Sequence, residues 1–219
     1  MAGKATLIAA TALRDRILAF AAAQAGADRN DCQIDDDAVL CGDQRIPLTE
    51  LAAAAQREGM LLAEASKAYG SPVSIAFNAH GFRAAVNRVT GEVVILQSVH
   101  AADAGQVINP VQLRGQVEGA VSHGVGFALT EHIQFGPRGE VLNPNLRNYR
   151  IPAFADTPHT EVFFADTYDP IGPFGAKGQG EPPIITVAPA LANAVADATG
   201  ARIRELPLSP DLIFDRVSR

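Results

Sequence analysis

The segment Gly172-Pro173-Phe174-Gly175-Ala176-Lys177-Gly178-Gln179-Gly180-Glu181-Pro182-Pro183 contains four glycines and three prolines. This composition excludes a regular helix or a central strand, because glycine readily adopts positive φ and proline lacks a backbone donor. We therefore predict an ordered turn that holds one acid, Glu181. Gly180 lets other groups approach its backbone closely, and Pro182 favours an extended backbone at Glu181. A carboxylate in such a turn can be aimed at a partner.

The residues that follow the turn, 184–198, are mostly apolar and predict a buried helix. A carboxylate placed just before a buried helix is a candidate general base. The alternative is an ordinary surface loop in which Lys177 and Glu181 face water, and glycine and proline content alone favours that alternative.

Four further motifs occur along the chain, and their order is informative. They are Asp103-Ala104-Gly105-Gln106-Val107-Ile108-Asn109-Pro110, Arg114-Gly115-Gln116-Val117-Glu118-Gly119, Asn148-Tyr149-Arg150-Ile151-Pro152-Ala153-Phe154-Ala155-Asp156-Thr157-Pro158, and Asp197-Ala198-Thr199-Gly200 followed by Leu206-Pro207.

Together with the Gly/Pro segment, these motifs resemble the xanthine dehydrogenase/aldehyde oxidase family of molybdenum hydroxylases. That family has the patterns G-x-K-x-x-G-E-x-P, D-x-G-x-x-I-N-P, G-Q-x-E-G-G, Y-x-I-P-x-x-x-D-x-P and A-T-G…L-P in the same places. One departure is Ala120, where the family has a second glycine. The resemblance implies that Glu181 is the base beside the molybdenum. It also implies that the cofactor is contacted by Gly115, Gln116, Lys177, Gly178, Gln179 and Gly180.

The resemblance further implies hydroxylation of a small molecule, an aldehyde or an N-heterocycle, with water as the oxygen donor. The metal would be held by the dithiolene of a pterin, in its cytosine dinucleotide form, rather than by protein side chains. Iron–sulfur clusters and FAD are expected on partner chains only. Family subunits are several times longer, so we expect a split subunit or a truncated piece that needs the remaining molybdenum-binding half.

A helix is predicted from residue 111 to about residue 130, with Asn109 as its N-cap and Pro110 in its first turn. It contains Gly115, Gly119, Gly124 and Gly126, and each glycine costs a helix about 1 kcal/mol relative to alanine. Either a ligand or tight helix packing must explain them. The residues alone leave both explanations open.

Composition narrows the function classes. The chain has 219 residues and a net charge of −6, so no basic surface argues for nucleic acid, and no apolar run is long enough to span a membrane. The two cysteines, Cys32 and Cys41, form no metal-binding spacing and no disulfide framework. We expect them to be reduced and the chain to be cytoplasmic, without protein-bound zinc.

Helical and alternating patterns are mixed along the chain, which predicts an α+β fold in two lobes. Residues 1–70 are expected to form a lobe with an amphipathic helix and a small hairpin. Residues 71–219 are expected to form the cofactor-binding lobe. In this second lobe, a long hairpin over 74–99, a short one over 133–142 and a strand over 161–165 are predicted.

Two other functions remain possible. The chain could be a non-catalytic scaffold of the same fold that binds no cofactor. It could also be a phosphate-binding enzyme, because residues 175–180 are rich in glycine and include a lysine. The segment lacks the G-K-[ST] ending of phosphate-binding loops, which argues against this alternative.

Overall fold

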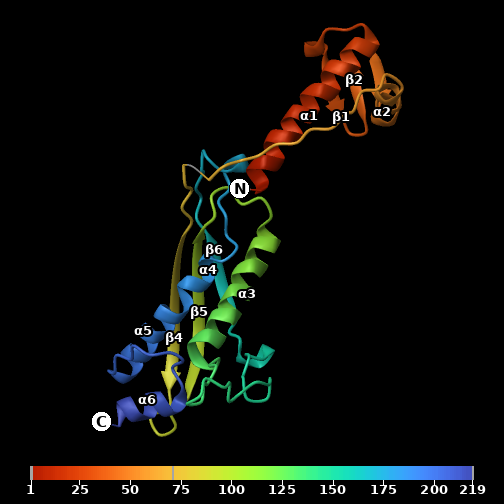
Figure 1. The fold of residues 1–219 in the computed structure, drawn as a ribbon. Helices are drawn as coiled ribbons and strands as arrows, with labels where there is room; N and C mark the ends of the chain where they lie inside the picture. Colours follow the sequence, from red (N-terminus) through yellow and green to blue (C-terminus); the bar gives the residue numbers. More distant parts are fainter. Residues whose placement is uncertain (1, 71, 219) are drawn as a thin grey trace. The chain divides into compact units, whose positions relative to one another are not determined.

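The computed structural model describes residues 2–70 and 72–218. The chain divides into two compact units, Met1–Val73 and Ser74–Arg219. Each unit combines helices with a three-stranded sheet, as Figure 1 shows. The α+β fold that the sequence predicted is confirmed.

The first unit consists of two helices and an antiparallel sheet of strand order β1-β2-β3. Its elements are α1 (Ala2–Ala25), η1 (Arg29–Asp31), β1 (Cys32–Asp35), β2 (Ala38–Cys41), β3 (Gln44–Pro47) and α2 (Leu48–Arg57). Leu18, Phe20 and Ala21 of α1 pack with Val39 and Leu51 to form its core. The predicted hairpin is confirmed, and β3 extends it by one strand.

Cys32 and Cys41 form a disulfide in this unit. They are paired directly across β1 and β2, with Cα atoms 4.1 Å apart. The expectation of two reduced cysteines is therefore wrong. The predicted hairpin contained the reason, because its register places the two residues opposite each other. A cytoplasmic location stays a prediction.

The second unit contains a sheet of strand order β4-β5-β6. Its elements are β4 (Phe77–Val86), β5 (Val93–Asp103), α3 (Pro110–Leu129), η2 (Phe154–Asp156), β6 (Thr160–Phe164), η3 (Pro173–Gly175), α4 (Pro182–Ile185), α5 (Val187–Thr199) and α6 (Pro210–Val217). Strands β4 and β5 form the predicted long hairpin, whose turn has Gly91 at φ 76°. Strand β6 pairs with β5 in parallel, which the sequence did not predict.

Helices α3 and α5 pack on the strands and on each other. The core between them includes Val117, Val121 and Val125 of α3, and Val187 and Leu191 of α5. Asn109 caps α3 through a hydrogen bond that the Gln112 backbone donates to its side chain, as predicted. A second small core surrounds α6 at the far end of α5, centred on Val195, Leu208 and Ile213.

Two predicted elements differ in detail. The short hairpin over 133–142 is reduced to a single bridge between Phe135 and Val141. The buried helix is divided at Thr186 into α4 and α5, and it ends as expected at Gly200, which has φ 80°.

Candidate functional site

The Gly/Pro segment, residues 172–183, lies against the end of strand β5. The Lys177 amide donates to the Ala104 carbonyl at 2.7 Å, and the Gln106 amide donates to the Gly175 carbonyl at 2.8 Å. A Cβ atom on Gly105 would lie 2.2 Å from the Gly175 oxygen, and Gly105 has φ +62°. Glycine is therefore required at this position for the two backbones to meet.

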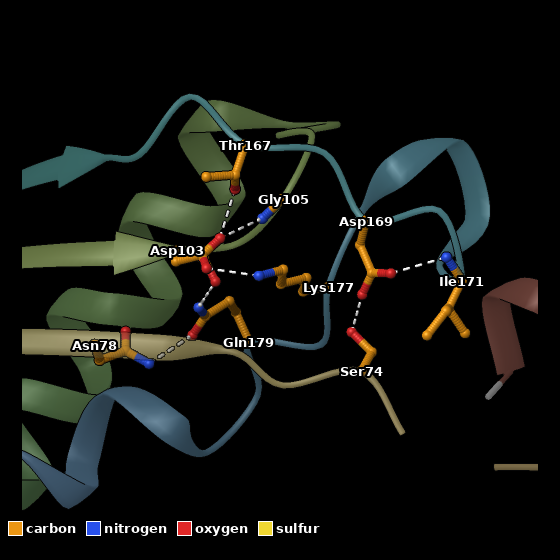
Figure 2. A network of polar contacts seen from close by, with 9 residues as sticks. All are labelled: Ser74, Asn78, Asp103, Gly105, Thr167, Asp169, Ile171, Lys177 and Gln179. Atoms are coloured by element: carbon orange, nitrogen blue, oxygen red, sulfur yellow. Dashed lines mark hydrogen bonds and ion pairs between the residues drawn. The ribbon is translucent and has the colours of Figure 1, made fainter. Parts of the chain in front are cut away.

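Asp103 is the centre of the contacts that fix the segment (Figure 2). Its carboxylate accepts hydrogen bonds from Lys177 Nζ at 2.5 Å and from Thr167 Oγ1 at 2.5 Å, and the Gly105 amide donates to it at 3.3 Å. Both side chains of the ion pair are largely covered, with exposures of 15% for Lys177 and 21% for Asp103. The hydrogen bond from Lys177, followed by that from Thr167, holds the Asp103 pKa below its ordinary value.

Gln179 also points into the protein, as Figure 2 shows. Its side chain is 7% exposed, and its Nε2 donates to the Asp103 carbonyl at 2.8 Å. Asn78 Nδ2 of β4 donates to Gln179 Oε1 at 3.3 Å. The Lys177 ammonium and the Gln179 amide are thus both engaged inside the fold.

A second acid, Asp169, supports the same loop from the opposite side. Its carboxylate accepts hydrogen bonds from the Ser74 hydroxyl and from the Ile171 amide, the latter at 2.8 Å (Figure 2). The hydrogen bond from Ser74 is the largest cause of the lowered pKa of Asp169. Sequence reasoning missed Asn78, Thr167 and Asp169. Asn78 was detectable, because it is a polar residue at an inward position of an alternating strand.

Helix α3 is joined to the loop by Gln116. Its Nε2 donates to the Gly180 carbonyl at 2.5 Å, so Glu181 lies one residue from a direct contact with the glycine-bearing helix. Gly115 and Gly119 of α3 are exposed, and a Cβ atom built on either meets nothing within 4 Å. The structure therefore brings the predicted residues of helix and loop together.

The other two glycines of α3 have a different surrounding. A Cβ atom on Gly124 would lie 2.5 Å from Val187 Cβ of α5, and one on Gly126 would lie 2.1 Å from Glu131 Oε1. Tight packing explains these two positions. For Gly115 and Gly119 in the first half of the helix, the ligand explanation stays a prediction.

Glu181 is exposed and precedes α4 as its N-cap residue. Its backbone is helical, with φ −102° and ψ −23°, so the expected extended conformation is wrong. The reason is local, because α4 begins at the next residue. Gly178 and Gly180 beside it are exposed as well, and a Cβ atom on either meets nothing within 4 Å.

A cavity of about 650 Å³ lies elsewhere in the second unit, between the start of β5, the end of α3 and residues 150–158. None of the predicted site residues lines it. The loop and the first half of α3 form an open surface instead. Within residues 2–70 and 72–218, no cluster of three His, Cys, Asp or Glu side chains could hold a metal ion.

Residues 1–158 match the family model of the molybdopterin cofactor-binding domain. The chain belongs to this family. The aldehyde oxidoreductase molybdenum-binding subunit PaoC of Escherichia coli K12 is 35% identical over 202 residues, which are 90% of this chain and 27% of PaoC. The 6-hydroxypseudooxynicotine dehydrogenase complex subunit gamma of Paenarthrobacter nicotinovorans is 31% identical and covers 99% of this chain, and thus the loop.

Solved structures of molybdenum enzymes share the fold. A Cu,Mo-CO dehydrogenase matches 98% of this chain and 28% of its own, with a TM-score of 0.82 and 26% identity. Quinoline 2-oxidoreductase from Pseudomonas putida 86 matches 96% of this chain with a TM-score of 0.81 and 25% identity. The resemblance to the molybdenum-binding subunits of the xanthine dehydrogenase/aldehyde oxidase family is confirmed. The chain spans 27–29% of the length of the two relatives just named.

The open surface fits a molybdopterin cofactor. Four exposed glycines leave space in which a ligand can approach the backbone closely: Gly115, Gly119, Gly178 and Gly180. Gln116, between the first two, is exposed and carries an amide group.

In the part of the chain that the structure describes, no helix is both long and apolar enough to cross a bilayer.

Proposed function

We propose that this chain is the part of a molybdenum hydroxylase that carries the catalytic base, and that Glu181 is that base. The observation that supports this most strongly is the hydrogen bond between Gln116 and the Gly180 carbonyl, which holds the residue before Glu181 against the helix that carries the open glycines. The substrate would be an aldehyde or an N-heterocycle, and water would supply the oxygen.

The proposed cofactor contacts divide into two kinds. Gly115, Gly178 and Gly180 would contact the cofactor through their exposed backbone, and Gln116 through its amide oxygen, because its Nε2 already donates to the Gly180 carbonyl. Lys177 and Gln179 would act indirectly, because their polar groups already contact Asp103. When bound, the molybdenum–pterin group supplies the two-electron redox chemistry of the hydroxylation.

The role of Glu181 is to accept a proton on a carboxylate oxygen. The proton comes from the water-derived hydroxyl that attacks the electron-poor carbon of the substrate. A carboxylate does this best when the surrounding backbone holds it still. Asp103, Lys177 and Gln179 provide that rigidity from the buried side of the loop.

The wider assembly is also proposed. The chain would act together with the remaining half of the molybdenum-binding subunit and with chains that carry iron–sulfur clusters and FAD. The pterin would be in its cytosine dinucleotide form, and the complex would be cytoplasmic. The relative from Paenarthrobacter nicotinovorans is named as one subunit of a complex, which supports partner chains.

The test is Glu181→Gln in a complex assembled with the candidate partner chains. We expect unchanged molybdenum content and a turnover lowered by at least about 100-fold, which is typical for the loss of a general base. Glu205→Gln, at another exposed glutamate, is the matched control and should leave turnover unchanged. In water labelled with ¹⁸O, the product of the wild-type complex should carry the label.

Two results would contradict the proposal. Normal turnover of the Glu181→Gln complex would remove Glu181 from the chemistry. A wild-type complex that assembles with every candidate partner, yet contains no molybdenum, would favour the non-catalytic scaffold.

A further inference from the structure

A continuous line of polar side chains crosses the inner face of the second sheet and ends at the loop. Ser98 and His100 have no exposed surface, and Thr160 is 2% exposed. Buried polar groups are costly unless each finds a hydrogen-bond partner. A line of them beneath a catalytic loop therefore suggests a positional role.

The contacts run from β6 across β5 and β4 to the loop without a break. They are Thr160 Oγ1 to Ser98 Oγ at 2.9 Å, Ser98 Oγ to His80 Nε2 at 3.0 Å, His80 Nδ1 to His100 Nδ1 at 3.1 Å, His100 Nε2 to Asn78 Oδ1 at 3.0 Å, Asn78 Nδ2 to Gln179 Oε1 at 3.3 Å, and Gln179 Nε2 to the Asp103 carbonyl at 2.8 Å.

The donor and acceptor roles in this line of hydrogen bonds are fixed at the end that meets the loop. The Asp103 carbonyl can only accept, so Gln179 must present its Nε2 there and its Oε1 to Asn78. Asn78 then donates through Nδ2 and presents Oδ1 to His100. His100 must therefore carry a hydrogen on Nε2.

The same reasoning continues through the two histidines. Burial lowers the pKa of His100, and burial followed by the charge of His100 lowers the pKa of His80 to about 4, so both rings are neutral at pH 7. A neutral His100 with its hydrogen on Nε2 accepts at Nδ1. His80 must therefore donate from Nδ1 and accept at Nε2 from the Ser98 hydroxyl, which in turn accepts from Thr160.

We propose that Asn78, His80 and His100 are positioning residues that fix Gln179 and, through it, the loop that presents Glu181. Gln179 lies between Gly178 and Gly180, which have no side chains to hold the backbone. Its buried amide thus anchors the loop between Lys177 and α4 from the inside, while Gln116 holds the Gly180 carbonyl from α3. This inference rests on the proposed function only for the role of Glu181.

The first test reads the two rings directly in the complete chain, without cofactor. In the chain labelled with ¹⁵N-histidine at pH 7, long-range ¹H–¹⁵N spectra should show His80 protonated on Nδ1 and His100 on Nε2. A His80 that carries its hydrogen on Nε2, or a charged ring at pH 7, would overturn the proposed direction.

The second test asks whether the line fixes the loop. In Asn78→Leu, amide order parameters of Gly178 and Gly180 should fall from about 0.85 to below about 0.6, the range of flexible backbone. Gly91, in the β4–β5 turn, is the control and should not change. Gln179→Met removes the same contact from the loop side, leaves the strands intact, and should give the same result.

Unchanged order at Gly178 and Gly180 in both variants, or an equal loss at Gly91, would contradict the positioning role. In the assembled complex, Gln179→Met should lower kcat per bound molybdenum, with KM unchanged. If the loop loosens while kcat is retained, the base role of Glu181 is wrong, although the line of hydrogen bonds stands.

Discussion

The two halves of helix α3 use glycine for opposite purposes. In the second half, Gly124 is buried, and a side chain there would collide with Val187. In the first half, Gly115 and Gly119 are exposed and face open space beside the loop. A glycine in a helix therefore indicates either tight packing or an open surface, and only its surroundings tell which.

The loop shows the same division between a buried and an open side. Lys177 and Gln179 direct their side chains to Asp103 in the interior, whereas Gly178, Gly180 and Glu181 are exposed. The buried side holds the backbone in place, and the open side is free to bind. Changes on the buried side should reduce stability, and changes on the open side should reduce cofactor binding.

The largest expected effect is a loss of folding stability at acid pH, caused by the histidines on the buried side of the loop. The unfolded chain protonates His80 at its ordinary pKa of 6.5, and the folded chain only at about 4, so acid favours unfolding between these values. Stability should be complete above pH 6.5 and fall by at most about 3 kcal/mol as the pH approaches 4. Urea unfolding, followed by resolved amide signals of β4 and β5, measures this.

The control for that prediction is His80→Gln, which removes the titrating ring and should make the fall in stability between pH 6.5 and pH 4 smaller. Asp103 has its ordinary pKa of 3.8 in the unfolded chain and a lower pKa in the folded chain, so its own contribution to stability falls only as the pH approaches 4. A stability that is flat between pH 7 and pH 5 would contradict a neutral, half-buried His80.

Lys177→Ala should have the next largest effect. It leaves a largely covered Asp103 carboxylate without its ammonium partner, and the free energy of unfolding should fall by about 2 kcal/mol. Arg150→Ala is the matched control, because its ion pair with Asp156 is 3.9 Å long and 70% exposed on the arginine side. That variant should unfold as the wild type does. If both variants lost the same free energy of unfolding, the covered ion pair at Asp103 would contribute no more to stability than the exposed pair.

The smallest effects come from a pair of alanine substitutions in α3. Gly124→Ala should destabilise the chain by about 1 to 2 kcal/mol, because the new methyl group meets Val187. Gly115→Ala should stabilise it by up to about 1 kcal/mol, because alanine favours helix and nothing lies within 4 Å. Thermal or urea unfolding of both variants measures the difference. The same sign for both would mean that the two halves do not differ.

Much of this arrangement could be predicted from the sequence. Asn109 and Pro110 signalled the start of α3, Gly91 the turn of the long hairpin, and the Gly/Pro content the irregular loop. The family was recognisable from the motifs. These features depend on local backbone preferences, which can be read directly from the residue types.

The rest depends on contacts between distant residues. Neither the parallel pairing of β6 with β5 nor the line from His80 to Gln179 has a local signal, because each joins separate parts of the chain. The disulfide needed the register of Cys32 and Cys41. The helical backbone at Glu181 could not be predicted from the proline that follows it, because the start of α4 overrides that preference.

The central claim is that the open side of α3 and the loop binds the molybdenum cofactor. The most direct measurement is the molybdenum content of the assembled complex when Gly115→Leu fills that space, with His123→Leu, at an exposed position farther along α3, as the control. We predict that the Gly115→Leu complex assembles but loses most of its molybdenum, and that the control retains it. A Gly115→Leu complex with full molybdenum content would contradict the claim.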